Sequence, residues 1–205
     1  MQGYVLNINK VRDEDLIVTI LGENHIHTAY RFYGARHSNI HIGYKIDFEL
    51  EINIKSTIPR LKDVIQLGFP WLLDSKKLYF WQLYIKLFYS HLKDVEEIDD
   101  FYMELLNDLV ERITKQNPKR AILESYVKLC EYEGRLHDGF VCLLCDLPIE
   151  ENISLVRGFL TTHSVCSYSK NFEIKKITEF FTNKSLIDFD EDEIEYLWGI
   201  ILQGL

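Results

Sequence analysis

Hydrophobic and polar residues alternate along the first 66 residues in short runs separated by Gly, Asn and charged residues, which is the pattern of β-strands. The clearest run covers residues 44–55, where every second side chain is large and apolar. Further strands are expected at residues 3–9, 16–21, 25–33 and 56–66. Five short strands favour a small closed or partly open barrel, because closure removes exposed sheet edges. The predicted inward face of the clearest strand consists of Ile46, Phe48, Leu50, Ile52 and Ile54.

The spacing of apolar residues becomes helical after Pro70. Asn117 followed by Pro118 is typical of a helix start, and Gly134 is typical of the left-handed residue that follows a helix end. The fold class is therefore predicted as α+β, with a β-barrel domain at residues 1–72 and an all-α domain at residues 73–205. The other helices are expected at residues 76–92, 101–114, 173–182 and 190–203.

Two short motifs between residues 138 and 169 have the spacing of a metal-binding knuckle pair. Cys142 and Cys145 are separated by two residues, and His163 and Cys166 repeat that gap at the intervening length usual for zinc sites, about 15–20 residues. Zinc accepts thiolate and imidazole ligands alike, so a structural site with three cysteines and one histidine is chemically sound. The alternative is that the cysteines are reduced core residues and the histidine is an ordinary surface residue. Cys130 lies in a helical pattern and is predicted to be a core residue.

We do not expect enzymatic activity. No nucleotide-binding glycine loop, nucleophile elbow or metalloprotease helix occurs in the chain. Zinc deaminases use one histidine and two cysteines, but they carry a His-x-Glu motif, whereas His137 precedes Asp138 and Gly139 here. A catalytic zinc also needs an open position, which Cys166 would fill.

Composition is that of a soluble protein with an ample core, at 47% hydrophobic and 27% charged residues. Neither a signal peptide nor an apolar run long enough for a membrane span is found, and the few cysteines fit a reduced cytosolic protein. The net charge is −9, and all of this excess lies in residues 74–205, with 15 basic and 24 acidic residues. Residues 1–73 are neutral, so this part can still present a basic face.

Cations and aromatic residues are interleaved between residues 30 and 38 of the β-domain. Such combinations hold single-stranded DNA, because every base can stack and every nucleotide carries a charge. Arg36 and His37 would project from a turn at the end of this segment. The alternative is that the aromatics belong to the barrel core and the arginines are ordinary surface residues. By charge and location we add four further candidates for phosphate contact: Lys10, Arg12, Arg31 and Lys45.

Taken together, these motifs make the chain similar to the RecO family of bacterial recombination mediators. The run from residue 14 to 21 resembles that family's opening strands, and the turn at 33–38 resembles its glycine-alanine-arginine signature. Residues 134–145 and 159–166 resemble the two knuckles of metal-bearing members. Three departures occur: His163 stands in place of a cysteine, Asp146 in place of a glycine, and the Gly-Gly pair before the second knuckle is absent.

The resemblance implies an OB-fold barrel followed by a helical domain that carries the zinc knuckle, in a cytoplasmic, nucleoid-associated bacterial protein. It implies binding to single- and double-stranded DNA and annealing of complementary strands. It also implies partnership with RecR and the single-strand-binding protein in loading RecA during gap repair. Within this resemblance, Arg36 and His37 occupy the basic turn and are the first candidates for phosphate contact.

A second hypothesis is that the acidic helical domain makes the chain a protein-interaction adaptor with weak or no DNA binding of its own. A pocket for an acidic, aromatic peptide tail would need a cation beside an apolar groove. Arg120, Lys128 and Arg135 are the candidates, although ordinary solvated helix faces would look the same in sequence.

Overall fold

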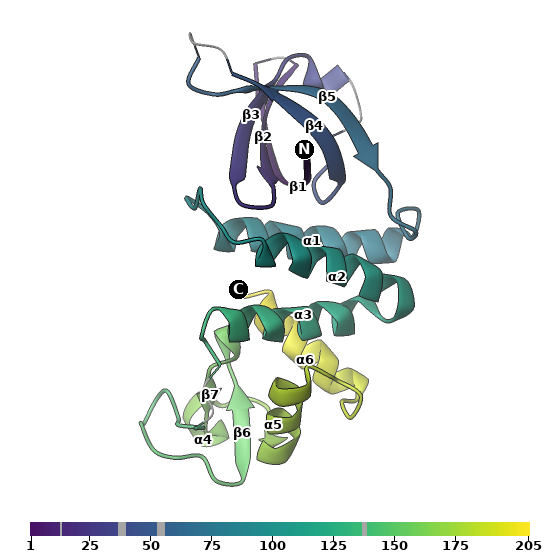
Figure 1. Cartoon of the computed structure of the whole chain (residues 1–205). Helices are drawn as coiled ribbons and strands as arrows, with labels where there is room; N and C mark the ends of the chain where they lie inside the picture. Colours follow the sequence, from purple (N-terminus) through teal and green to yellow (C-terminus); the bar gives the residue numbers. More distant parts are fainter. Residues whose placement is uncertain (13, 37–39, 53–55, 137–138) are drawn as a thin grey trace. The chain divides into compact units, whose positions relative to one another are not determined.

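The computed structural model describes residues 1–12, 14–36, 40–52, 56–136 and 139–205 (Figure 1). Packing divides the chain into two compact units, Met1–Lys115 and Gln116–Leu205. The first unit joins the barrel to two helices, whereas the sequence suggests a domain boundary at residues 72/73, which stays a prediction. None of the helices in the described parts of the chain combines the length and the apolar character of a membrane span.

The first unit contains the predicted five-stranded barrel. The strands follow the order β1-β2-β3-β5-β4 around the closed sheet, and all neighbours are antiparallel except β3 and β5, which meet in parallel at Tyr30 and Arg60. This arrangement confirms the expected closed barrel ahead of a helical region. The strands are β1 (Gln2–Val11), β2 (Asp15–Leu21), β3 (Ile26–Arg31), β4 (Lys45–Glu51) and β5 (Arg60–Leu67).

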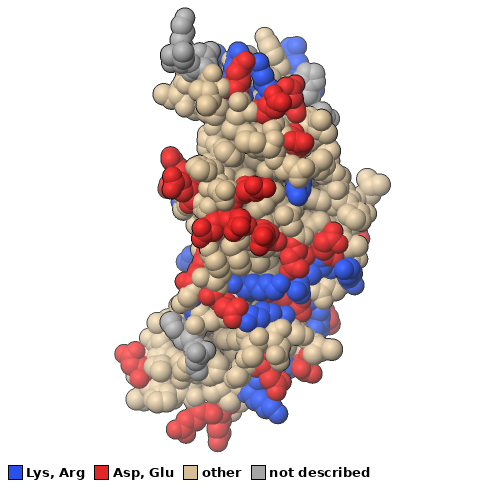
Figure 2. Space-filling model, viewed as in Figure 1, with Lys and Arg blue, Asp and Glu red and all other residues tan. Residues whose placement is uncertain are grey.

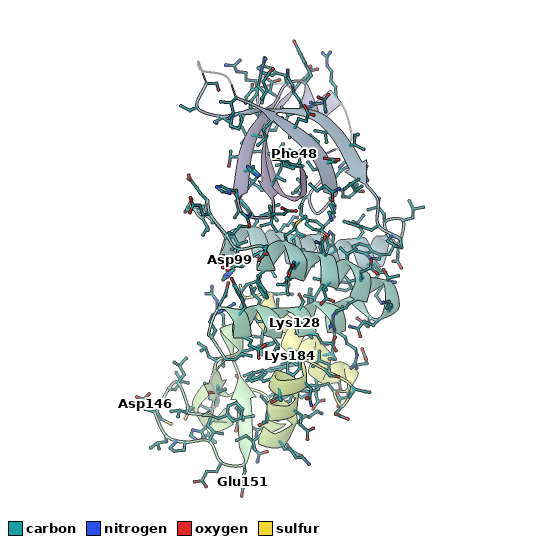
Figure 3. All side chains as sticks on the ribbon, in the orientation of Figure 1. Phe48, Asp99, Lys128, Asp146, Glu151 and Lys184 are labelled. Atoms are coloured by element: carbon teal, nitrogen blue, oxygen red, sulfur yellow. The ribbon has the colours of Figure 1, made fainter. Side chains whose placement is uncertain are left out.

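Over most of β4, every second residue is apolar and lies inside the barrel, as predicted. Ile46 and Phe48 are buried, and Phe48 lies inside the barrel (Figure 3). The prediction is wrong for Ile52, whose side chain is 86% exposed, because β4 ends at Glu51. The predicted inward residue Ile54 lies outside the described residues.

Helices α1 (Ser75–His91) and α2 (Phe101–Lys115) complete the first unit. Asp74 caps α1 by accepting the backbone N–H groups of Lys76 and Lys77. Trp81 of α1 donates from Nε1 to the carbonyl of Gly43 at 2.7 Å. Gly43 has φ +85°, and a Cβ added there would lie 2.6 Å from Trp81 Nε1, so this close approach requires glycine.

The second unit is mainly helical and also carries a small sheet of order β7-β6-β8. As predicted, Asn117 caps the first helix with Pro118 at its first position. The structure also shows a capping box between Asp190 and Glu193 at the start of the last helix. Cys130 is fully buried, which confirms the core prediction. The elements are α3 (Pro118–Tyr132), β6 (Asn152–Leu155), η2 (Arg157–Phe159), β7 (Thr161–Thr162), α4 (Ser164–Ser167), β8 (Phe172–Glu173), α5 (Ile174–Asn183) and α6 (Glu191–Ile201).

Candidate nucleic-acid interface and metal centre

Strand register brings most of the predicted DNA-binding residues to one end of the barrel. Val11 pairs with Asp15, Leu16 pairs with Arg31, and Arg60 pairs with both Tyr30 and Glu51. All of these pairs lie at the same end, which we call the upper rim. Within the described residues the upper rim comprises residues 10–12, 14–15, 30–36, 49–51 and 60–62, the segment Gly34–Arg36 forming the short helix η1.

Two aromatic side chains of the upper rim face solvent. Phe32 is 42% exposed and Tyr33 is 57% exposed. The Phe32 ring packs edge-to-face on Tyr30, with ring centroids 4.7 Å apart. The Arg60 guanidinium lies over the Phe32 ring, 4.3 Å from its centroid. These aromatics are therefore not core residues, and they stand beside cations as a base-stacking surface requires.

Asp15 fixes the backbone that carries these aromatics. Its carboxylate accepts the Tyr30 hydroxyl at 2.5 Å and the Tyr33 backbone N–H at 2.9 Å. Tyr33 has φ +51°, which breaks the strand alternation and turns the chain into η1. The hydrogen bond from Tyr30, and then that from Tyr33, lower the pKa of Asp15. The charged form of Asp15 thus stabilises this part of the rim.

Arg36, the leading candidate from sequence, lies on the upper rim and is exposed. Its Nε lies 2.5 Å from a Glu14 carboxylate oxygen, and its guanidinium stands 5.5 Å from the centre of the Tyr33 ring. Lys10 and Arg12 are exposed in and beside the end of β1. His37 lies outside the described residues.

Two predicted candidates are placed less favourably for phosphate contact. Arg31 is half-buried at the rim, and its Nη1 donates to the Leu61 carbonyl at 2.9 Å. Lys45 lies at the opposite end of the barrel, where Nζ donates to Asn107 at 3.0 Å. Burial lowers the pKa of Lys45. Both remain predictions, but the structure groups neither with the exposed cations.

Arg60 and Lys62 reach the upper rim although sequence reasoning did not single them out. Lys62 Nζ lies 2.6 Å from Glu51, and Arg60 lies 3.7 Å from the same carboxylate. The hydrogen bond from Lys62 is the main cause that lowers the pKa of Glu51. Their alternate spacing on β5 was the available signal, but the pairing of β5 with β3 and β4 is what places Arg60 beside Phe32. Figure 2 shows cations and carboxylates interleaved at this end.

The candidate cations of the second unit have structural partners. Arg120 donates to the carbonyls of Leu186 and Phe189 and pairs with Glu191 at 2.7 Å. Arg135 pairs with Glu133 at 2.7 Å and stacks over the Tyr126 ring. Lys128 is half-buried on α3. The positions of Arg120 and Arg135 do not supply a free cation beside an apolar groove.

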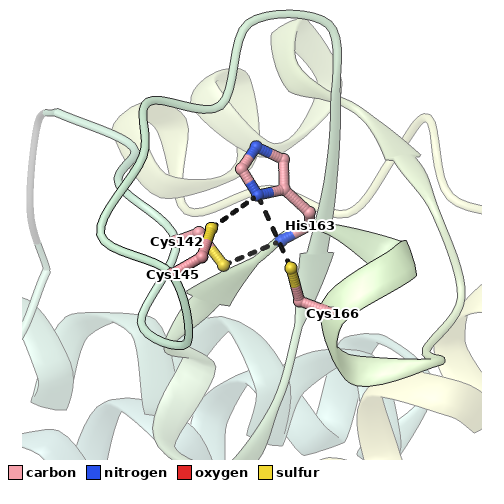
Figure 4. Close-up of side chains that lie close together, drawn as sticks. All are labelled: Cys142, Cys145, His163 and Cys166. Carbon is pink, nitrogen blue, oxygen red and sulfur yellow. Dashed lines mark hydrogen bonds between the residues drawn. The ribbon is translucent and has the colours of Figure 1, made fainter.

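The two knuckles meet as their spacing predicts. In the first loop the N–H of Asp146 donates to the carbonyl of Cys142 at 2.9 Å. In the second loop the N–H of Cys166 donates to the carbonyl of His163 at 3.0 Å as α4 begins. The four ligand atoms of Cys142, Cys145, His163 and Cys166 all lie within 4.8 Å of one another (Figure 4). These residues therefore form a cluster that could hold a metal ion.

His163 is oriented so that it could ligate a metal ion. Its Nδ1 lies 3.4 Å from the sulfur of Cys145 and 4.0 Å from that of Cys166, whereas a tetrahedral zinc separates such atoms by about 3.6 Å. Its Nε2 lies 3.1 Å from the Pro148 carbonyl oxygen. Because a carbonyl only accepts hydrogen bonds, this contact places the proton on Nε2 and directs the Nδ1 lone pair toward the sulfurs.

The thiols of the cluster influence one another electrostatically. Burial of Cys142 disfavours its thiolate, but backbone N–H groups, those of His163 and Leu144 foremost, together lower its pKa to about 6. Burial, followed by the neighbouring sulfurs, raises the pKa of Cys166 to about 11. One thiolate therefore forms readily, whereas several together need a cation among them, which is what a metal ion supplies.

One departure from the RecO pattern has a backbone explanation. Asp146 follows Cys145 where the family carries glycine, and it has φ +56°. Glycine enters this left-handed region without steric cost, and aspartate is among the few other residues that tolerate it. At Asp146 the knuckle loop therefore adopts the left-handed conformation that a glycine would also allow.

Comparison with known proteins adds one finding. Residues 1–72 match the family model described as RecO N terminal, whereas no curated protein matches the chain. The matched residues contain the whole barrel and the upper rim. This match supports a role in DNA recombination and repair. Residues 1–72 are thus similar to the N-terminal domain of the RecO family.

Proposed function

We propose that the protein is a non-enzymatic recombination mediator that binds DNA through the upper rim and anneals complementary strands. The observation that carries this proposal is the pair of exposed aromatics, Phe32 and Tyr33, beside Arg36 and Arg60 in a RecO N-terminal domain. With RecR and the single-strand-binding protein, it would help to load RecA in gap repair. The family resemblance supports these partners.

The chemistry of the upper rim fits a single-stranded nucleic acid. A base can stack on Phe32 or Tyr33, and the neighbouring guanidinium groups can contact phosphates. Each of these arginines already has a carboxylate neighbour, Glu14 for Arg36 and Glu51 for Arg60. A phosphate must therefore compete with a carboxylate for each arginine, so we expect moderate affinity that falls steeply with salt.

Fluorescence anisotropy with labelled single strands at several salt concentrations tests this proposal. We expect binding at low salt and a linear fall of log affinity with log salt concentration. Arg36→Ala should weaken binding, whereas Lys86→Ala, which removes an exposed cation of α1, should leave it nearly unchanged. No binding at low salt, or equal effects of the two variants, would contradict the proposal.

We further propose that the four-residue cluster holds a structural zinc ion. Three cysteines and one histidine would close its coordination, so the ion would brace the knuckle loops and take no part in a reaction. Elemental analysis should find about one zinc per chain in the wild type, little in Cys145→Ser, and a full content in Cys130→Ser. Cys130 is the matched control because it is buried and lies outside the cluster. Equal zinc in wild type and Cys145→Ser would contradict the assignment.

A further inference from the structure

The knuckle loops expose a group of large apolar side chains that neither DNA binding nor metal binding uses. Leu143 and Leu144 lie between the first two ligands, Leu147 follows them, and Val165 lies between the last two. Val165 is 76% exposed and Tyr168 is 94% exposed, while the three leucines are each more than half exposed. We call these five residues the knuckle surface.

The members of the knuckle surface come from two loops that the fold holds together. The ligand atoms of the two loops lie within 4.8 Å of one another, so the cluster brings the two loops together. The N–H of Leu143 also donates to the carbonyl of Thr161 at 3.0 Å, which ties the first loop to β7. Figure 4 shows the two loops approaching from opposite sides of the cluster.

The exposure of these side chains is not needed to build the knuckle. The same segment turns Cys142, Ile149, Ile153 and Phe159 inward, and these four residues are buried. Polar residues would serve the exposed loop positions equally well, because only backbone groups there make the knuckle hydrogen bonds. Grouped exposed apolar residues on a soluble protein mark a surface that another molecule covers.

The charges beside the knuckle surface indicate what that molecule is. Between residues 139 and 156 the only charged residues are Asp146, Glu150 and Glu151, and all three are exposed. Asp146 and Glu151 project into solvent from the second unit (Figure 3). The next cations along the chain are Arg157, which lies against Gly204, and Lys170, which is half-buried.

This acidic border discriminates among partners. It repels a DNA backbone and an anionic membrane surface, and a second copy of the chain would bring carboxylates against carboxylates. An apolar segment flanked by lysine or arginine would bury the leucines and pair with the border. We propose that the knuckle surface is a docking site for a basic, amphipathic segment of a partner protein. This site is distinct from the upper rim and does not depend on DNA binding.

Anisotropy with a labelled synthetic peptide tests the docking site on the full, zinc-loaded chain. The probe is an amphipathic peptide of about five helical turns with leucines on one face and lysines on the other, and its matched partner carries glutamates in place of the lysines. We expect the lysine peptide to bind, and the glutamate peptide to bind about tenfold or more weakly. Glu150→Lys should reduce the difference in affinity between the lysine and glutamate peptides.

Variants of the surface complete the test. Leu144→Ser and Val165→Ser should each weaken binding of the lysine peptide about tenfold, whereas Ile187→Ser, which removes an exposed apolar side chain outside the knuckle, should not. Zinc content and circular dichroism of each variant establish that the knuckle is intact. No binding of the lysine peptide, equal binding of both peptides, or equal loss in Ile187→Ser would overturn the proposal. Sedimentation that shows a dimer broken by Leu144→Ser would also overturn it, because a second copy would then cover the surface.

Discussion

Replacing Phe32 with alanine tests whether the upper rim stacks a base. The Arg60 guanidinium lies over the Phe32 ring at 4.3 Å, and Tyr30 packs against it edge-on. One ring face is thus occupied, so Phe32 can stack with at most one base. Loss of one base–aromatic stack costs about 1–3 kcal/mol. At about 1.4 kcal/mol per tenfold change, Phe32→Ala should raise the Kd about 5- to 150-fold.

The salt dependence separates this effect from loss of a charge. Phe32→Ala removes no cation, so the slope of log affinity against log salt concentration should stay as in the wild type. Arg60→Ala should instead reduce the slope by about 0.7 if that arginine contacts one phosphate of a single strand. The assay is anisotropy of a labelled single strand across a salt series, with a thermal melt to show that each variant is folded.

Tyr79→Ala provides the matched control for this experiment. Tyr79 is an exposed aromatic residue of α1 in the same unit, away from the rim. Its removal should leave the affinity unchanged. Wild-type affinity in Phe32→Ala, or an equal loss in Tyr79→Ala, would refute the stacking role, and a changed salt slope in Phe32→Ala would show that the ring acts by positioning a cation.

Three further predictions concern stability. Gly43→Ala should lower the free energy of unfolding by about 2–4 kcal/mol, because the new Cβ would crowd Trp81 at a left-handed φ. Tryptophan fluorescence during guanidinium unfolding measures this loss, and an unchanged unfolding midpoint would contradict it. Arg120→Ala should lower the free energy of unfolding by about 2–4 kcal/mol in chemical denaturation, because two carbonyls and Glu191 lose their donor. As a control, Lys175→Ala, which removes an exposed lysine, should change it by less than about 0.5 kcal/mol. Folding lowers the pKa of Asp15, so its contribution is complete above the ordinary carboxyl range and disappears as the pH falls through the folded-state pKa. Asp15→Asn should therefore flatten the acid side of the stability–pH curve, and a curve as steep as the wild type's would exclude this role.

Local patterns in the chain were sufficient to predict the five barrel strands and the five long helices, but not the short strands β6, β7 and β8. Alternation located β4 because burial of one sheet face imposes a period of two, and Asn117-Pro118 located α3 because the cap and fixed φ act locally. The pattern failed at Ile52, where the strand ends and the next residue no longer faces the core. The local pattern does not indicate the residue at which the pairing of β4 with β5 ends.

For the candidate sites, too, local patterns predicted one part and missed another. The spacing of Cys142, Cys145, His163 and Cys166 predicted a shared site, because each loop is short enough to fix its own two ligands. Apart from Arg36 and His37, which a turn motif indicated, the DNA-binding candidates were chosen by charge and location only. Sequence therefore included Lys45, which the barrel places at the end opposite Arg36, and left out Arg60, which the barrel places over Phe32.

The sequence by itself determined the five barrel strands, the five long helices and the four knuckle residues that cluster, since each strand, helix and knuckle is specified by residues close together in the chain. Tertiary structure alone decided which cations share the upper rim with Phe32 and which apolar side chains of the knuckle stay outside. The physical reason is that strand register and loop convergence join residues far apart in the chain. Whether a given charge or ring meets solvent depends on those joined segments, and no local pattern contains that information.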